Sequence, residues 1–224
     1  MTYLELCVKL RGECGIQGTG PTTVLAQTGL LGKIVAWIAD ADQEICDMWL
    51  NWNFLWDEFT ATTVIATAQV TQATDLSTWD TDSFYLDYTT ANHKKLIEMD
   101  YSLWRRVYRN GVKTSAKPSF FVIRPDKDII LEAPPDDEYT LTADYWKYAA
   151  RLSANTSASL IPARFQRIII ARAKMYFAEH ENAPEVMEGA QMEYGNLLSA
   201  LQAAELPGQG PTRTGSNDLV VVVE

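Results

Sequence analysis

The hydrophobic pattern changes its period at residue 60, and this change constrains the fold more than any other feature of the chain. From Gly29 onward, apolar residues recur at steps of three and four as far as Phe59, which is the spacing of one face of an α-helix. Residues 60–70, TATTVIATAQV, are instead rich in β-branched side chains, which favour strands. The sequence therefore predicts a long helix over residues 29–58, followed by a β-rich segment.

The predicted long helix carries a concentration of tryptophan in the stretch WLNWNFLWDEF, residues 49–59. On a helix these aromatic residues would follow the spacing i, i+3, i+7 and i+10 and would lie on one stripe: Trp49, Trp52, Trp56 and Phe59. Either the stripe is core, or it is shared between the core and a subunit interface, where tryptophan is enriched. We expect part of it to be core and its Phe59 end to anchor the β-rich segment.

Helical signals also occur at both ends of the chain. Thr2 can cap a helix over residues 2–14, and a glutamate three residues later completes a capping box. A proline suited to a first helical turn opens a helix over residues 162–181. The sequence Asn-Ala-Pro then separates it from a helix over residues 184–206. A connection this short predicts two antiparallel neighbours.

The sequence pattern of residues 60–149 predicts a small, largely antiparallel β-module. The clearest hairpin joins SFFVIR, residues 119–124, to IILEAP, residues 129–134, through the turn PDKD. Segment 101–111 fits either a short helix or another strand. Residues 138–149 begin with strict alternation, which places four residues on one face: Tyr139, Leu141, Ala143 and Tyr145.

The C-terminal residues predict an arm. Residues 207–217, PGQGPTRTGSN, have the composition of a linker, and the heptapeptide DLVVVVE follows them. An exposed apolar strand is an aggregation hazard in a monomer, so it is expected to pair with a sheet edge. That edge can belong to a neighbouring protein or to the chain's own sheet, and the sequence leaves both open. The candidate binding residues are Leu219, Val220, Val221, Val222 and Val223.

Together these signals predict an α+β fold. A helical bundle is built from the N-terminal and C-terminal helices, and it carries a central antiparallel β-module. We expect a single domain over residues 1–206, with an extended C-terminal arm over residues 207–224.

The net charge of the chain and its distribution indicate which kinds of molecule the protein can bind. The chain has 19 basic and 29 acidic side chains, for a net charge of −10, which disfavours tight wrapping around nucleic acid. Acidic ends flank two basic blocks, residues 101–133 and 161–180, and this alternation suits copies of one chain docking side by side. Arg105, Arg106 and Arg109 form a candidate electrostatic interface, either for an acidic partner, which the net charge favours, or for nucleic acid.

Motifs for catalysis and metal binding are weak. The chain has only two histidines, His93 and His180, so a Ser-His-Asp or Cys-His mechanism has little support. Its three cysteines have neither zinc-ligand spacing nor a CxxC pair, which favours a reduced compartment. The acidic clusters at 80–82 and 136–138 lie in turn-rich surroundings, where aspartate is common. We expect no enzyme activity, no cofactor and no metal.

Two parts of the chain resemble bacteriophage head-to-tail adaptor proteins, the portal-binding connector or neck family. The first contains YLELCVKLRGECGIQGTGP, QTGLLGKIVAWI and the tryptophan-rich segment; the second contains RFQRIIIARAKMYFAEHENAPEVMEGAQMEYGNLLSAL. The resemblance is one of pattern, order and length over residues 3–59 and 138–205. It implies a virion structural protein that forms a homo-oligomeric ring, usually of twelve copies, between the portal and the next tail or nozzle protein. Such a ring extends the DNA channel and lets DNA pass without specific binding. In related adaptors a C-terminal extension reaches onto the portal, which implies that role for residues 207–224.

The expected location follows from the resemblance and the N-terminus. MTYLELCVKLRGE has no charged start followed by an apolar run, so no signal peptide is expected. No apolar stretch approaches the ~18 residues of a membrane span. We therefore expect a protein made in the host cytoplasm and incorporated into the virion neck or tail, without a membrane partner. Two alternatives stay open: a carbohydrate-binding or carbohydrate-active phage protein that uses surface aromatics, and a DNA-end-processing factor.

Overall fold

The computed structural model describes residues 1–89, 92–110 and 113–206. These residues form two compact units, where the sequence was interpreted as one domain with a β-rich insertion. The helical unit comprises residues 1–46 and 51–54 together with the described chain from residue 150 onward; the β-rich unit comprises residues 47–50 and 55–149. Five α-helices and two small sheets in the described chain confirm the α+β class.

The first helix of the helical unit forms as its sequence predicts. Helix α1 spans Tyr3–Glu13. The side chain of Thr2 accepts a hydrogen bond from the N–H of Glu5, at 3.3 Å, and the Glu5 carboxylate accepts one from the N–H of Thr2, at 2.8 Å. This reciprocal capping box satisfies two N–H groups that a helix start otherwise leaves unpaired. The helix buries Leu6, Cys7 and Leu10.

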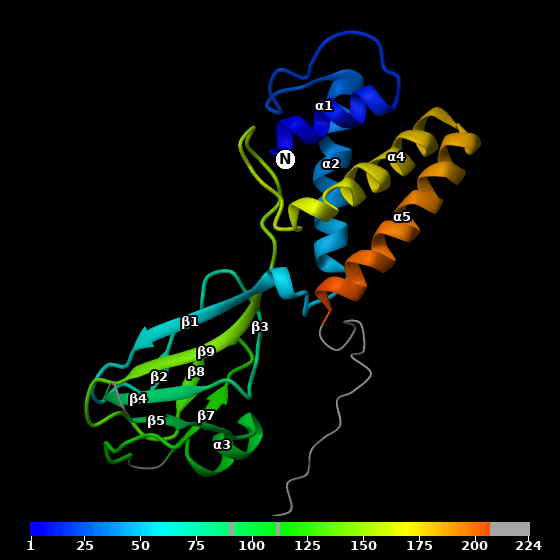
Figure 1. The fold of residues 1–224 in the computed structure, drawn as a ribbon. Coiled ribbons are helices and arrows are strands. Elements are labelled where there is room, and N and C mark those ends of the chain that lie inside the picture. Colours follow the sequence, from blue (N-terminus) through cyan, green and yellow to red (C-terminus); the bar gives the residue numbers. More distant parts are fainter. Residues whose placement is uncertain (90–91, 111–112, 207–224) are drawn as a thin grey trace, which may run out of the picture. The chain divides into compact units, whose positions relative to one another are not determined.

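The C-terminal helices pair as the short connection predicts. A single 3-10 turn, Ala163–Phe165, precedes helix α4, Arg167–Glu181, and helix α5 spans Pro184–Glu205. Asn182 ends α4 in the left-handed conformation, with φ of 52°, which a short polar residue tolerates well. The two helices lie antiparallel and side by side (Figure 1).

The predicted helix over residues 29–58 is wrong after residue 47. Helix α2 spans Gly29–Asp47 only; a turn and a 3-10 turn, Asn53–Leu55, follow it. Strand β1, Trp56–Thr62, then pairs along its whole length with β9, Thr140–Lys147. This ladder gives the backbone groups of every second β1 residue partners that lie 78 to 90 positions later in the chain, so local periodicity cannot reveal it.

Two sheets make up the β-rich unit. One has the order β1-β9-β4-β5, with β3 also pairing with β9; the other has the order β2-β8-β7-β6. All strand pairs are antiparallel except β6 with β7. The remaining strands are β2 (Gln69–Val70), β3 (Leu76–Trp79), β4 (Tyr85–Thr89), β5 (Asn92–Lys95), β6 (Ile97–Glu98), β7 (Phe120–Ile123) and β8 (Ile129–Leu131).

The structure confirms the predicted hairpin and decides the ambiguous segment. Strands β7 and β8 pair antiparallel around a turn in which Lys127 has a positive φ of 70°. The segment that fitted either a helix or a strand forms helix α3, Tyr101–Val107. The side chain of Asp100 accepts a hydrogen bond from the N–H of Leu103, at 2.9 Å, and so caps its first turn.

The β-rich unit has one main core that draws on both sheets. The predicted alternation in β9 is confirmed, because Leu141, Ala143 and Tyr145 are buried. The rings of Phe84 and Phe121 stack in this core with centroids 3.9 Å apart. Phe59 and Ala61 of β1 pack against this core, which holds β1 in place on the β-rich unit.

Candidate interaction surfaces

The described residues contain no group of three or more His, Cys, Asp or Glu side chains arranged to hold a metal ion. The two acidic clusters noted in the sequence make local contacts. Asp82 lies 3.6 Å from the Lys95 ammonium, and Asp136 accepts a hydrogen bond of 2.6 Å from the hydroxyl of Tyr139. None of the described helices has both the length and the apolar character needed to cross a membrane.

The three candidate tryptophans do not share one helical stripe, because the helix ends before them. Trp52 is fully buried, whereas Trp49 is 44% exposed in the turn after α2 and Trp56 is 48% exposed at the start of β1. The indole N–H of Trp52 donates to the carbonyl oxygen of Ile45 at 3.1 Å. It thus satisfies a carbonyl in the last turn of α2, so this residue helps to end the helix that it was predicted to continue.

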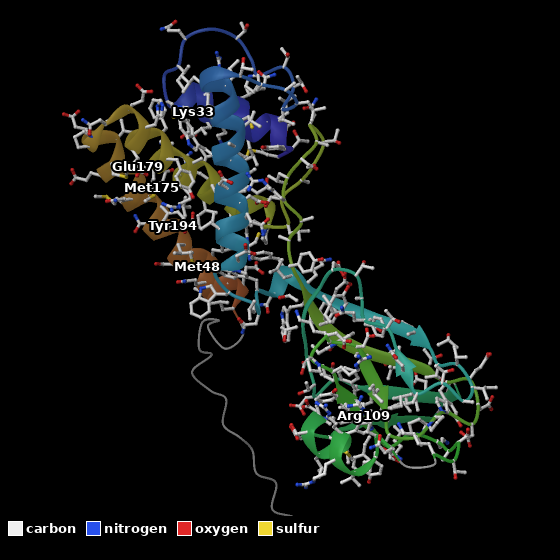
Figure 2. All side chains as sticks on the ribbon, turned by 180° about the vertical axis from the view of Figure 1, so that it is seen from behind. Lys33, Met48, Arg109, Met175, Glu179 and Tyr194 are labelled. Atoms are coloured by element: carbon white, nitrogen blue, oxygen red, sulfur yellow. The ribbon has the colours of Figure 1, made fainter. Side chains whose placement is uncertain are left out.

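The candidate electrostatic interface lies on and just beyond helix α3. Arg105, Arg106 and Arg109 are exposed, and none of them takes part in an ion pair with the other described residues. Trp104 is buried beneath them. Exposed apolar side chains surround the arginines: Leu103, Val107 and Tyr108. We call these six exposed residues the arginine surface. Arg109 is labelled in Figure 2. Binding by the arginine surface stays a prediction.

A second surface, which we call the carboxylate surface, carries negative charge and is thus opposite in charge to the arginine surface. Around the turn between α4 and α5, four glutamates are exposed: Glu179, Glu181, Glu185 and Glu188. One of them, Glu181, lies 2.8 Å from Nδ1 of His180, whose Nε2 contacts the ammonium of Lys33. A neutral imidazole suits both contacts, because Nδ1–H then donates to the carboxylate and Nε2 accepts from the lysine.

Strand β1 provides an open sheet edge within the β-rich unit, beside β9 in Figure 1. The N–H of Thr63 donates to the carbonyl of Tyr139, which makes their pair a hydrogen-bonded one. Bonded and non-bonded pairs alternate in an antiparallel ladder, so every second residue of β1 directs its backbone groups away from β9. These residues define the open edge of β1: Trp56, Glu58, Thr60 and Thr62. All four are also exposed.

A polar cluster holds helices α2, α4 and α5 of the helical unit together. Two guanidinium nitrogens of Arg172 donate to the two carboxylate oxygens of Glu44, each at 2.8 Å. The Tyr176 hydroxyl donates to the same carboxylate at 2.5 Å, and Arg172 also lies over the ring of Tyr194, 5.9 Å from its centroid. Figure 2 labels Tyr194 and Met175 in this region. Burial alone would raise the pKa of Glu44, but the hydrogen bonds and the positive charge of Arg172 hold that pKa below its usual value.

Asp42, two residues earlier on α2, has the opposite electrostatic environment. The residue is 2% exposed, and its Oδ1 has no hydrogen-bond partner among the described residues. Burial raises the pKa of this carboxyl from 3.8 to about 6, against the opposing effect of a hydrogen bond with Ser159. No local signal in the sequence distinguishes Asp42 from the other acidic residues of α2.

The sequence thus singled out the three exposed arginines, whose role as an interface stays a prediction, but it gave no sign of the open edge of β1 or of the Glu44–Arg172 pair. The predicted arm residues, from Leu219 to Val223, lie outside the described residues. In a comparison with known protein families, the model of the family described as SU10 adaptor protein matches residues 1–217. A search of curated proteins finds no match for the chain.

Proposed function

The chain belongs to the SU10 adaptor protein family, a family of bacteriophage structural adaptors, and from this premise we propose that it forms a homo-oligomeric ring that connects the portal at the capsid vertex to the tail. The observation that carries the proposal is the family match, because it spans residues 1–217 and therefore both units. In this role the protein extends the DNA channel and belongs to the neck of the virion. Its partners are other copies of itself, the portal and the next tail or nozzle protein.

Two features of the described residues and the net charge of the full chain support a role in assembly. The arginine surface and the carboxylate surface carry opposite charges, which suits docking between protein surfaces. Trp49, Leu50 and Trp56 expose apolar area, and tryptophan is prominent among interface hot spots. The net charge of −10 disfavours tight binding of DNA phosphates, which suits a ring through which DNA passes.

The proposal is tested by measuring particle mass. The purified full-length chain, of 25.1 kDa, is analysed by light scattering and native mass spectrometry, alone and after mixing with the portal protein of the same phage. We expect a closed oligomer bound to the portal, and no binding to the portal of an unrelated phage. A chain that stays monomeric in both samples and binds no portal would contradict the proposal.

A further inference from the structure

We propose that the open edge of β1 receives the C-terminal heptapeptide, residues 218–224, of a second copy of this chain as an added strand. This inference rests on the proposed function, because it names the contact that joins neighbouring copies. The family match ends at residue 217, so the heptapeptide lies beyond the matched residues.

The first step concerns the backbone of the acceptor. An edge strand with outward-directed N–H and C=O groups is a template for another strand. The open edge of β1 offers such groups at alternate positions over a strand of seven residues. Only the N–H of Glu58 is covered locally, by a hydrogen bond of 2.9 Å to the Asp57 carboxylate. Charged side chains and proline commonly protect an edge; in β1 the charges are confined to Asp57 and Glu58, and residues 59–62 contain neither a charge nor a proline.

The second step concerns the side chains of the acceptor. Phe59 and Ala61 point to the core side of β1 but stay only partly buried, although both pack against the main core. Phe59 meets Trp79 edge-to-face, with ring centroids 5.1 Å apart. A strand added beside β1 would place every second side chain on this same face. Apolar side chains there would cover the remaining exposed parts of Phe59 and Ala61, which a polar peptide would not do.

The third step concerns the donor. The heptapeptide DLVVVVE has the same length as β1 and five consecutive apolar residues, four of them valine. β-branched residues have high strand propensity, and valine on alternate positions matches the apolar face that Phe59 and Ala61 present. The preceding linker, residues 207–217, has eleven residues and can extend over roughly 36–40 Å, so the heptapeptide can reach another molecule.

The fourth step concerns the choice of a second copy. A donor strand and an acceptor edge are different surfaces, and each copy carries both. Such a head-to-tail contact links one copy to the next. The chain of copies closes into a ring when a whole number of these rotations makes a full turn. A strand exchanged in this way accounts for an apolar terminus and an unprotected edge in one chain, because each protects the other against unspecific pairing.

Cross-linking between two different variants tests the pairing. The acceptor carries Thr60→Cys and lacks residues 218–224; the donor carries Thr60→Pro and, in separate preparations, Val220→Cys, Val221→Cys or Val222→Cys. Directly opposite residues on neighbouring strands have Cβ atoms about 4.5–5.5 Å apart, within about 1 Å of the separation in a disulfide, so a small movement allows the bond to form. We expect an acceptor–donor disulfide for at least one register. The acceptor without Thr60→Cys is the control for Cys7, Cys14 and Cys46.

The proline substitution tests the edge in the otherwise unchanged full-length chain. The N–H of Thr60 points away from β9, so Thr60→Pro removes no hydrogen bond of the sheet, and proline is tolerated at such an edge position. We expect Thr60→Pro to weaken self-association up to about tenfold, since the one hydrogen bond lost with the N–H contributes up to about that factor. Thr60→Ala, which keeps the N–H, should associate as the unchanged chain does. Circular dichroism of both variants shows that the sheet is retained.

The outcomes separate this inference from the proposed function. An acceptor–donor disulfide together with weaker assembly of Thr60→Pro supports the inference. The absence of an acceptor–donor disulfide in all three preparations overturns it, and so does a donor cysteine that, after portal protein is added, cross-links only to the portal protein. If the same samples still form portal-bound rings, the proposed function stands while the strand pairing fails.

Discussion

Arg172 on α4 and Glu44 on α2 form a two-point ion pair, with both nitrogen–oxygen distances at 2.8 Å. Their side chains are 20% and 40% exposed, so the pair is neither a solvated surface contact nor a deeply buried one. Hydrogen bonds to charged groups in such surroundings stabilise more than a surface salt bridge does. The pair therefore contributes to the packing of α2 against α4.

Replacing Arg172 with methionine tests this contribution. Methionine keeps much of the apolar stem, so the change removes chiefly the two hydrogen bonds and the charge. We expect Arg172→Met to lower the free energy of unfolding by about 2 kcal/mol, measured by urea titration with far-UV circular dichroism. The matched control is Arg151→Met, since its pair with Asp40 is 54% and 44% exposed; its loss should stay below about 1 kcal/mol. Equal losses for both variants would show that the two-point geometry adds nothing.

The raised pKa of Asp42 predicts a distinct pH dependence. Because the folded value, about 6, is above the unfolded value of 3.8, the neutral carboxyl favours the folded state at low pH. This stabilisation is lost as the pH rises through about 6. Glu44 acts in the opposite direction, because its lowered pKa adds stability as the pH rises; this contribution is the same in both chains and cancels when the Asp42→Asn variant is compared with the unchanged chain.

The comparison of Asp42→Asn with the unchanged chain measures this effect. Between about pH 4 and about pH 8, the stability of the variant relative to the unchanged chain should rise by up to about 3 kcal/mol. The difference between the two pH values is the observable, because any constant cost of the asparagine cancels. A difference that does not change with pH would mean that Asp42 ionises normally in the folded protein.

Replacing Trp52 or Trp49 with alanine should lower the free energy of unfolding by different amounts. Trp52 is fully buried and donates to the Ile45 carbonyl, so Trp52→Ala should cost about 3–5 kcal/mol through the cavity and the uncapped helix end. Trp49 is 44% exposed, and Trp49→Ala should change stability by less than about 1 kcal/mol. Thermal and urea unfolding of the two variants give the comparison. A large cost for Trp49→Ala would show that its ring packs within the monomer.

The arginine surface should affect binding without affecting folding. Because its arginines are exposed and form no ion pair with described residues, changing all three to glutamate should leave the unfolding midpoint nearly unchanged. We expect the same variant to lose assembly or portal binding, and the unchanged chain to bind less well at high salt. The control changes Arg105, Arg106 and Arg109 to lysine, which keeps the charge. Salt-dependent DNA binding that the glutamate variant loses would instead favour nucleic acid as the partner.

Local signals in the sequence determined several elements because each depends on neighbouring residues. The capping box of Thr2 and Glu5 defines the start of α1. The break at Asn182 separates α4 from α5, and the strict alternation in β9 identifies its buried face. The exposure of the Arg105–Arg109 segment also follows from its charge, which is costly to bury.

The tertiary structure alone decided where α2 ends and what the tryptophans do. The step of three and four residues continues through Trp56, so the sequence fits a longer helix, but residues 56–62 instead pair with β9 as a strand. That contact joins residues far apart in the chain and leaves no local trace. The same holds for the pairing of Glu44 with Arg172 and for the burial of Asp42. Sequence periodicity reports what a segment can form, whereas the free energy of distant contacts determines which alternative it adopts.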